Sequence, residues 1–225
     1  MKSLLSDITI RVNQEIYLKD PESSDLGQNI IKGSIHLIEN LGFECFTFKK
    51  LATEIKSTEA SIYRYFESKH KILLYLSSWY WGWMEYRIVF GLANIESAEE
   101  RLLKALHILL EEIEEDLNFE HINERKLNNI VIAESSKVYH THQVDEENKK
   151  GVFLGYKKLV NRISDIILEI NPEFNYPHML ISTVIEGANN QRYFAEHLPN
   201  LTDTVKGEDA IITFYKKMVL RTIEI

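Results

Sequence analysis

Apolar residues recur at helical spacing along most of the chain, so the hydrophobic pattern predicts a predominantly helical protein. The first helix begins at Asp20-Pro21-Glu22, which combines an N-cap residue, a proline at the first helical position and an acid in the first turn. It ends at Gly42, because glycine readily adopts the left-handed conformation at a helix C-terminus. The pattern therefore predicts a helix over residues 21–41.

The segment before this helix follows a different pattern. Ile8, Ile10 and Val12 alternate with polar residues, and the apolar positions resume at Ile16. Alternation with a period of two is typical of a half-buried strand. Residues 1–20 are therefore predicted to form an N-terminal extension that contains a short β-hairpin and packs its apolar face against the rest of the protein.

Two short helices and the start of a third are predicted in the next part of the chain. Thr47 can cap the first, Ser57 or Thr58 the second, and Ser68 the third. Each cap is followed by apolar residues at helical spacing, and the small Ala52 stands where the first two helices would cross. Two short helices joined by a tight turn form a helix-turn-helix.

Beyond this region the chain reads as a body of long helices separated by polar or proline-containing breaks. Residues 72–90, ILLYLSSWYWGWMEYRIVF, form one apolar helix that holds all three tryptophans. Further helices are predicted over residues 97–117, 122–138, 147–170, 176–197 and 207–223. The predicted fold class is therefore all-α.

The composition indicates the size of the core and the cellular compartment of the protein. With 225 residues, of which 44% are hydrophobic, the chain can bury a sizeable core. Cys45 is the single cysteine, which excludes an internal disulfide and fits a reducing compartment. No apolar run approaches the about 20 residues that a membrane span needs, and the N-terminus lacks a signal-peptide core. We expect a cytoplasmic protein without a membrane partner.

The charge is distributed unevenly along the chain. The formal net charge is -8, yet the stretch from Thr47 to Lys71 holds six of the 26 lysines and arginines against three glutamates. This stretch has a net charge of +3, which leaves -11 for the remainder. A basic module on an acidic body favours binding of phosphate groups at one face. A solvated, charged helix face is the alternative interpretation.

The residues of this module resemble the DNA-binding domain of TetR-family transcriptional regulators. The shared features are the LGF motif, Thr47, the Leu51-Ala52 pair, the IYRYF motif at residues 62–66 and the Ser68-Lys69 pair. The resemblance implies a three-helix helix-turn-helix DNA-binding domain over residues 21–72. It also implies a helical ligand-binding and dimerisation domain over residues 73–225.

The resemblance further implies which residues meet DNA. Tyr63 and Lys69 stand at positions where the family contacts backbone phosphates, and a phosphate at a helix N-terminus gains from the free N–H groups as well as from the lysine. Arg64 can read guanine, Glu59 can accept from cytosine, and Ala60 can meet a thymine methyl group. The full set of expected DNA contacts is Thr47, Lys49, Lys50, Thr58, Glu59, Ala60, Ser61, Tyr63, Arg64, Tyr65 and Lys69.

Three features depart from the family's pattern. Lys56 occupies a turn position where the family usually has glycine, and a positive φ there costs a lysine about 1 kcal/mol. Glu59 places a carboxylate near phosphates. Residues 1–20 exceed the usual length before the first helix and can also serve as an arm toward the minor groove. The first two departures leave open a helical dimeric interaction module that has lost DNA binding.

The resemblance assigns two further surfaces to the helical body. In the family, the helix after the DNA-binding domain borders a ligand pocket, which makes Trp79, Trp83, Tyr86 and His107 candidate pocket residues, with core packing as the alternative. The last two helices pair with those of a second copy in the family. Candidate dimer residues, with burial inside one chain as the alternative, are Ile181, Val184, Ile185, Ala188, Ile211, Tyr215 and Met218.

Enzyme motifs are absent from the sequence. It contains no Gly-rich phosphate loop, nucleophile elbow, HExxH or paired-cysteine motif. His140 and His142 precede several acids, but residues two apart on a helix diverge by about 200°, so a polar loop is the simpler interpretation. We expect no catalytic, metal or cofactor site.

These observations together predict a transcriptional regulator. A single helix-turn-helix reads few base pairs, whereas a two-fold dimer reads a palindrome whose half-sites lie about 34 Å apart. The expected protein is a ligand-responsive repressor that acts as a homodimer on a palindromic operator, with an activator as the variant of the same mechanism. Its expected partners are double-stranded DNA, a second copy of the chain and a small-molecule effector.

Overall fold

The computed structural model describes residues 9–115 and 119–224. Regular structure in these residues is helical, and pairing of β type is limited there to one isolated bridge between Val205 and Glu208. This confirms the predicted all-α class. Among the described residues, no helix combines the length and the apolar character needed to cross a membrane.

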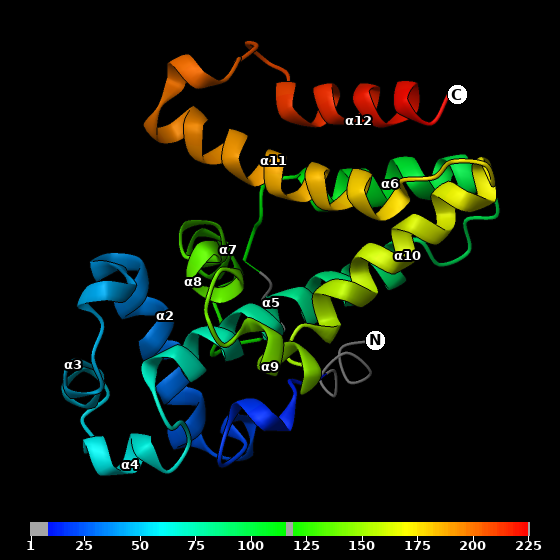
Figure 1. Cartoon of the computed structure of the whole chain (residues 1–225). Coiled ribbons are helices and arrows are strands. Elements are labelled where there is room, and N and C mark those ends of the chain that lie inside the picture. Colours follow the sequence, from blue (N-terminus) through cyan, green and yellow to red (C-terminus); the bar gives the residue numbers. More distant parts are fainter. Residues whose placement is uncertain (1–8, 116–118, 225) are drawn as a thin grey trace. The chain divides into compact units, whose positions relative to one another are not determined.

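The helices group into two compact units, which are described separately. Unit 1 consists of Met1–Trp83 and Ile113–Gly155, and unit 2 consists of Met84–Glu112 and Tyr156–Ile225. The division cuts the helices α5 (Lys69–Gly91) and α10 (Leu154–Ile170), which therefore contribute residues to both units (Figure 1). The boundary predicted between residues 72 and 73 follows the end of the helix-turn-helix and does not coincide with this division.

Unit 1 contains the predicted helix-turn-helix together with three short helices from later in the chain. Besides the first part of α5, its helices are η1 (Gln14–Ile16), η2 (Pro21–Ser23), α2 (Asp25–Cys45), α3 (Phe48–Glu54), α4 (Glu59–Tyr63), α7 (Glu124–Ala133), α8 (Ser135–Tyr139) and α9 (Val144–Lys149). Helix α2 packs against η2 and α3, which are near it in the sequence, and against α7 from the later segment. Within the helix-turn-helix, α3 packs on α2 and α4 packs on α3.

The start of α2 differs from the prediction by one turn. Asp20 caps the short helix η2 by accepting from the Glu22 N–H, and Ser24 caps α2 by accepting from the Gly27 N–H at 3.2 Å. A Cβ atom on Gly27 would lie 2.2 Å from the Pro21 carbonyl oxygen. Glycine at this position therefore lets η2 fold directly onto the first turn of α2.

The N-terminal extension packs on unit 1 without forming a hairpin. Ile8 lies outside the described residues, and the described part of the extension contains no strand. Ile10 and Ile16 are buried, as expected for an apolar face that packs. The Leu18 N–H donates to the Tyr65 carbonyl at 2.8 Å. The hairpin prediction was wrong because the backbone of this segment bonds to the helix-turn-helix instead of to a second strand.

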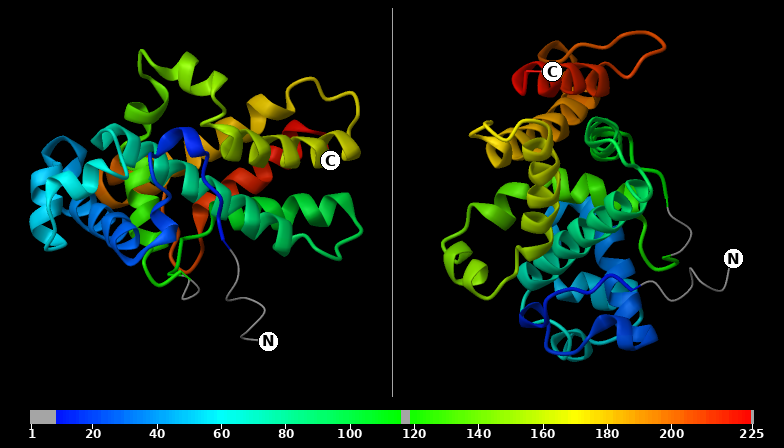
Figure 2. Two further views of the ribbon diagram at one scale, coloured as in Figure 1. Left: turned by 90° about the horizontal axis from the view of Figure 1, so that it is seen from below. Right: turned by 90° about the vertical axis from the view of Figure 1, so that its right-hand side faces the viewer.

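Unit 2 is built from the end of α5, most of α10 and the remaining helices of the chain. These are α6 (Ala98–Leu110), α11 (Pro177–His197), η3 (Pro199–Leu201) and α12 (Ala210–Thr222). Helices α6, α11 and α12 pack on one another, and Figures 1 and 2 show α12 alongside α11 from three directions. A Cβ atom on Gly187 would lie 2.3 Å from the Tyr215 hydroxyl, so this glycine permits the close approach of α11 and α12.

Two of the predicted long helices are divided in the structure. The helix expected over 122–138 breaks at Glu134, between α7 and α8. The helix expected over 147–170 breaks near Gly151, which has a φ of 80°, between α9 and α10. In both cases apolar positions continue at helical spacing through the break, so the pattern alone did not reveal it.

Candidate nucleic-acid interface

Side-chain caps position both helices of the helix-turn-helix, as predicted. The Thr47 hydroxyl accepts from the Lys50 N–H and the Thr58 hydroxyl from the Ser61 N–H, each at 3.2 Å. Between the two helices, Lys56 has a φ of 53°. The turn therefore adopts the left-handed conformation that the family's usual glycine implies, with lysine in its place.

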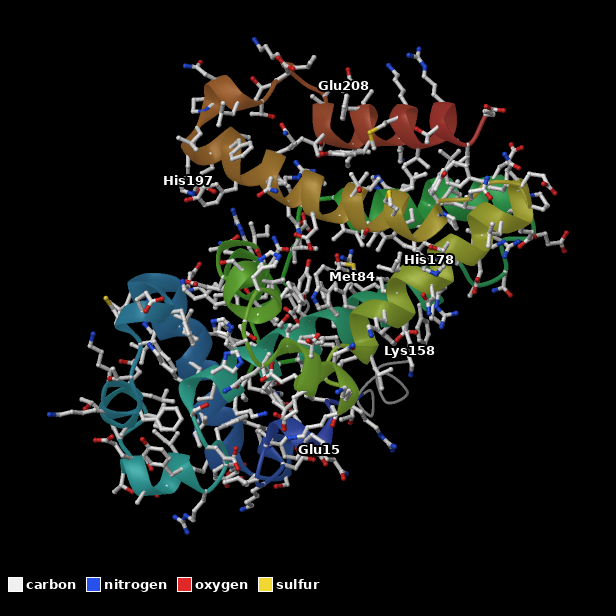
Figure 3. The ribbon with its side chains drawn as sticks, in the orientation of Figure 1. Glu15, Met84, Lys158, His178, His197 and Glu208 are labelled. Carbon is white, nitrogen blue, oxygen red and sulfur yellow. The ribbon has the colours of Figure 1, made fainter. Side chains whose placement is uncertain are left out.

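Aromatic and aliphatic side chains hold α3 against α4. Leu51 and Ile62 are fully buried between the helices, and the Phe48 and Tyr63 rings meet edge to face with centroids 4.7 Å apart. Aromatic side chains are visible between the two helices in Figure 3. Tyr63 nevertheless remains 51% exposed, and its hydroxyl makes no hydrogen bond within the described part of the chain. The ring is fixed while the hydroxyl stays available to a ligand.

The outer face of α4 carries a connected row of polar side chains. The Thr58 and Ser61 hydroxyls lie 2.9 Å apart, and the Arg64 guanidinium donates to the Ser61 hydroxyl at 3.1 Å. Thr58, Glu59 and Arg64 are exposed. Because one Arg64 nitrogen is anchored on its own helix, the guanidinium is oriented before any ligand binds.

Two lysines on α3 extend this face. Lys49 and Lys50 are exposed, together with Thr47. The Lys50 ammonium donates to the Cys45 carbonyl at 2.8 Å, whereas the Lys49 ammonium has no ion-pair or hydrogen-bond partner among the described residues. Lys49 can therefore bind a phosphate oxygen without first breaking an internal contact, whereas Lys50 already has one bond to the backbone.

Tyr65 does not lie on this face, which corrects the expectation that it reads a base. Its side chain is only 3% exposed, and its hydroxyl lies 2.8 Å from the Ser24 hydroxyl. The Lys19 ammonium covers the ring at 4.9 Å from its centroid. Helix α4 ends at Tyr63, so the chain has already turned inward at Tyr65.

Lys69 is engaged within the protein. Its ammonium donates to the carbonyls of Phe43, Glu44 and Phe46 at 2.9, 3.1 and 3.3 Å. A lysine ammonium has three donors, and all three are used here. A phosphate contact from Lys69 would require it to give up at least one of these bonds, so the structure assigns Lys69 a role inside the domain first.

The four candidate pocket residues are not gathered in one site within either unit. In unit 1, Trp79 and Trp83 are almost fully buried and stack with centroids 6.3 Å apart, which is core packing. In unit 2, Tyr86 packs against the ring of Phe90. His107 lies 3.3 Å from the Glu111 carboxylate with its side chain 41% exposed. A pocket lined by these residues stays a prediction.

Most of the candidate dimer residues lie in the interior of unit 2, which favours the alternative of burial inside one chain. Six of them are buried in a single chain: Ile181, Val184, Ile185, Ala188, Ile211 and Tyr215. Met218 is the exception. It shares a shallow depression on the outer side of α12 with Phe214, Lys217, Arg221 and Thr222. Phe214 is 59% exposed, so the outward apolar surface of α12 centres on it and Met218.

Sequence reasoning missed Glu134 as well as Phe214. Glu134 accepts from the Phe43 N–H in a buried site although the two residues are 91 positions apart. No local pattern indicates such a contact. Phe214 lies on the last predicted helix, and the hydrophobic pattern did not single it out as an outward-facing apolar residue.

Comparisons with known proteins agree with the geometry of this site. Residues 30–76 match the family model described as bacterial regulatory proteins, tetR family. A comparison of the sequence with curated proteins finds no match. Several solved structures share the fold of nearly the whole chain.

The fatty acid degradation regulator FadR from Bacillus halodurans is 15% identical with a TM-score of 0.60, covering 87% of this chain and 93% of that chain. AibR in complex with isovaleryl coenzyme A and operator DNA is 14% identical with a TM-score of 0.56, covering 86% and 97%. A protein from Saccharomonospora viridis described as a transcriptional regulator, in complex with choline, is 18% identical with a TM-score of 0.59, covering 89% and 97%. At these identities the likeness establishes the fold alone.

A capped helix-turn-helix with a polar, cationic outer face, followed by a helical body, defines a DNA-binding protein of the helix-turn-helix class. The family match covers the helix-turn-helix itself, from within α2 to within α5. Residues 30–76 therefore carry the DNA-binding domain of the bacterial regulatory proteins of the tetR family.

Proposed function

We propose that this protein is a repressor that binds a palindromic operator as a homodimer and releases it when a small molecule binds the helical body. The observation that carries the proposal is the outer face of α3 and α4, where side chains are oriented by internal contacts and still exposed. In this proposal residues 21–72 bind DNA, and residues 73–225 bind the effector and the second copy.

The contacts to DNA divide into two kinds. Lys49, Lys50 and the Tyr63 hydroxyl would bind phosphates and so position the protein on the duplex. Arg64 would read a guanine, and a well-formed bidentate contact of this type discriminates against other bases by about 1–3 kcal/mol. The anchoring of Arg64 on Ser61 supports this role, because an oriented guanidinium loses less freedom on binding.

Dimerisation would use the outer side of α12. Phe214 and Met218 provide apolar surface, and Lys217 and Arg221 border the same depression. An apolar centre with a polar rim is typical of protein interfaces. Two copies would then present two recognition helices to successive major grooves, about 34 Å apart.

Release by an effector would follow from a population shift. A small molecule that binds better to a dimer with the wrong spacing of recognition helices lowers the affinity for the operator. Among the structures of similar fold, AibR is described with isovaleryl coenzyme A and the Saccharomonospora viridis protein with choline. These two bound molecules differ in chemistry, so they support a small-molecule effector here without indicating its class.

The test is selection from a randomised duplex pool at two salt concentrations, followed by sequencing of the retained DNA. We expect a palindrome whose affinity falls steeply as salt rises. Failure to enrich any sequence at low salt, with a dimer present, would support the alternative of a module that has lost DNA binding, and exposed Glu59 would be its simplest cause.

Three variants sharpen this test on the selected operator. Lys49→Met should weaken binding to all sequences and reduce the slope of log affinity against log salt concentration by about two, one for each copy in the dimer. Arg64→Ala should relax the preference at one position of each half-site. Lys158→Met is the matched control, since Lys158 is an exposed lysine on α10 (Figure 3) and should leave both quantities unchanged.

A further inference from the structure

The helix α2 is interrupted just before the helix-turn-helix. Gly42 has a φ of 74° and a ψ of 157°, which is not helical, and the assigned helix resumes for one short turn up to Cys45. A Cβ atom on Gly42 would have no atom within 4 Å, so the glycine is needed for its backbone conformation alone. The interruption turns the next N–H, that of Phe43, away from the ladder of α2.

A carboxylate from the later part of unit 1 receives this N–H. Glu134 Oε1 accepts from the Phe43 N–H at 3.1 Å, and Glu134 is only 8% exposed. The other Glu134 oxygen pairs with the Lys137 ammonium, which also lies 3.5 Å from Glu44. The hydrogen bond to Glu134 is the main cause that raises the pKa of Lys137. Both carboxylate oxygens of Glu134 thus have partners within unit 1.

The start of α5 holds the other side of the same turn. The Lys69 ammonium binds the carbonyls of Phe43, Glu44 and Phe46, and it lies 4.6 Å from the centroid of the Phe43 ring. The Lys137 ammonium lies 6.0 Å from the same centroid. The Phe43 ring is therefore near two cations, while its N–H and carbonyl are both bound by side chains from elsewhere in unit 1.

We propose that Glu134 is a positioning residue for DNA binding: the α7–α8 corner holds the turn at Gly42–Phe46 and thereby sets the direction in which α3 and α4 leave α2. Thr47, which caps α3, directly follows this turn. Glu134 lies at the corner itself, as the C-cap of α7 and the N-cap of α8. A movement of this corner displaces the acceptor of the Phe43 N–H. The inference rests on the DNA-binding function proposed above.

Two substitutions of Glu134 separate its charge from its hydrogen bond to the Phe43 N–H. Glu134→Gln keeps an oxygen that can accept from the Phe43 N–H but removes the charge that pairs with Lys137. Glu134→Leu keeps a side chain of similar size without any acceptor, which leaves a buried N–H unpaired. Glu120→Leu is the control for the loss of one carboxylate, since Glu120 is exposed in the same segment of unit 1.

The first measurement is affinity for the selected operator over a range of salt concentrations, at a temperature where each variant is folded. Glu134→Leu should bind at least about tenfold more weakly with an unchanged slope against salt, because no phosphate contact is lost. Glu134→Gln should recover most of this loss, and Glu120→Leu should bind as the wild type does. Recovery of operator affinity in Glu134→Gln would show that the acceptor for the Phe43 N–H matters, and not a general loss of stability.

The second measurement is amide hydrogen exchange in the free protein. The Phe43 amide should exchange slowly in the wild type and in Glu134→Gln, and faster in Glu134→Leu. Wild-type operator affinity in folded Glu134→Leu would overturn this inference and leave the proposed function intact. Failure of the wild type to select any operator would overturn both, and the exchange data would then show only that the contact exists.

Discussion

Tyr63 and Tyr65 are two positions apart and have opposite environments. The Tyr63 hydroxyl is exposed and without a partner among the described residues, whereas the Tyr65 hydroxyl is bonded to Ser24. Removal of the Tyr63 hydroxyl deletes the proposed bond to a phosphate, and removal of the Tyr65 hydroxyl deletes the bond to Ser24, each worth about 1 kcal/mol. Because the dimer makes this contact in both half-sites, Tyr63→Phe should weaken operator binding about 30-fold, measured by fluorescence anisotropy. It should leave the melting temperature in thermal unfolding unchanged.

Tyr65→Phe is the matched variant with the opposite expectation. It should lower the free energy of unfolding by about 1 kcal/mol and leave operator affinity unchanged. If Tyr65→Phe weakened DNA binding in the folded protein while Tyr63→Phe did not, the assignment of the outer face of α4 would be wrong.

Tyr75 is a buried residue whose ionisation should limit stability at alkaline pH. Burial, and then the nearby Glu22 carboxylate that accepts from its hydroxyl at 3.1 Å, raise the pKa of Tyr75 well above its ordinary value. The unfolded chain loses this proton near pH 10, whereas the folded protein keeps it. The contribution of the Tyr75 proton to the free energy of unfolding is therefore fully present below about pH 10. It is lost as the pH rises above this value, by about 1 kcal/mol over the next pH unit.

The comparison with Tyr75→Phe isolates this effect from the other tyrosines. Urea unfolding from pH 7 to pH 11 should show the wild type more stable at neutral pH and the difference shrinking above pH 10. A constant difference across this range would show that Tyr75 ionises equally in the folded and unfolded protein.

At the scale of elements, the N-terminal extension packs its apolar residues against unit 1. Ile16 is 1% exposed, whereas Leu18, two positions later, is 59% exposed. Ile16→Ala should lower the free energy of unfolding by about 2–4 kcal/mol, because it removes buried methyl groups and leaves a cavity. Leu18→Ala should change it by less than about 0.5 kcal/mol. Urea unfolding measures this free energy for both variants. Equal effects would mean that the N-terminal extension is not packed in solution.

At the scale of the whole molecule, the proposed homodimer depends on the outer side of α12. Phe214→Asp would place a charge at the centre of an apolar contact, and we expect it to weaken dimerisation at least about 30-fold, the loss typical of a hot-spot residue. Phe90→Asp is the control, because Phe90 has the same 59% exposure at the end of α5. Sedimentation equilibrium measures both, and a dimer unaffected by Phe214→Asp would place the interface elsewhere.

Helix caps and turn conformations could be predicted from the sequence. The caps at Thr47 and Thr58 and the left-handed turn at Lys56 lie where the sequence predicts them. The helix predicted to end at Gly42 is interrupted there and resumes up to Cys45. Each depends on a residue type and on neighbours within about four positions, because capping bonds and backbone sterics act over one turn of chain. The helix-turn-helix was therefore predictable together with most of its exposed residues.

Which side of each helix faces inward was decided only by the tertiary structure. Periodicity predicted a last helix over residues 207–223 but not that Tyr215 would be buried and Phe214 exposed. It likewise could not bring Glu134 to Phe43, or give the Lys69 ammonium three carbonyls to bind. Burial and pairing depend on which distant elements pack together, and that choice is made by the whole chain at once and leaves no local pattern in the sequence.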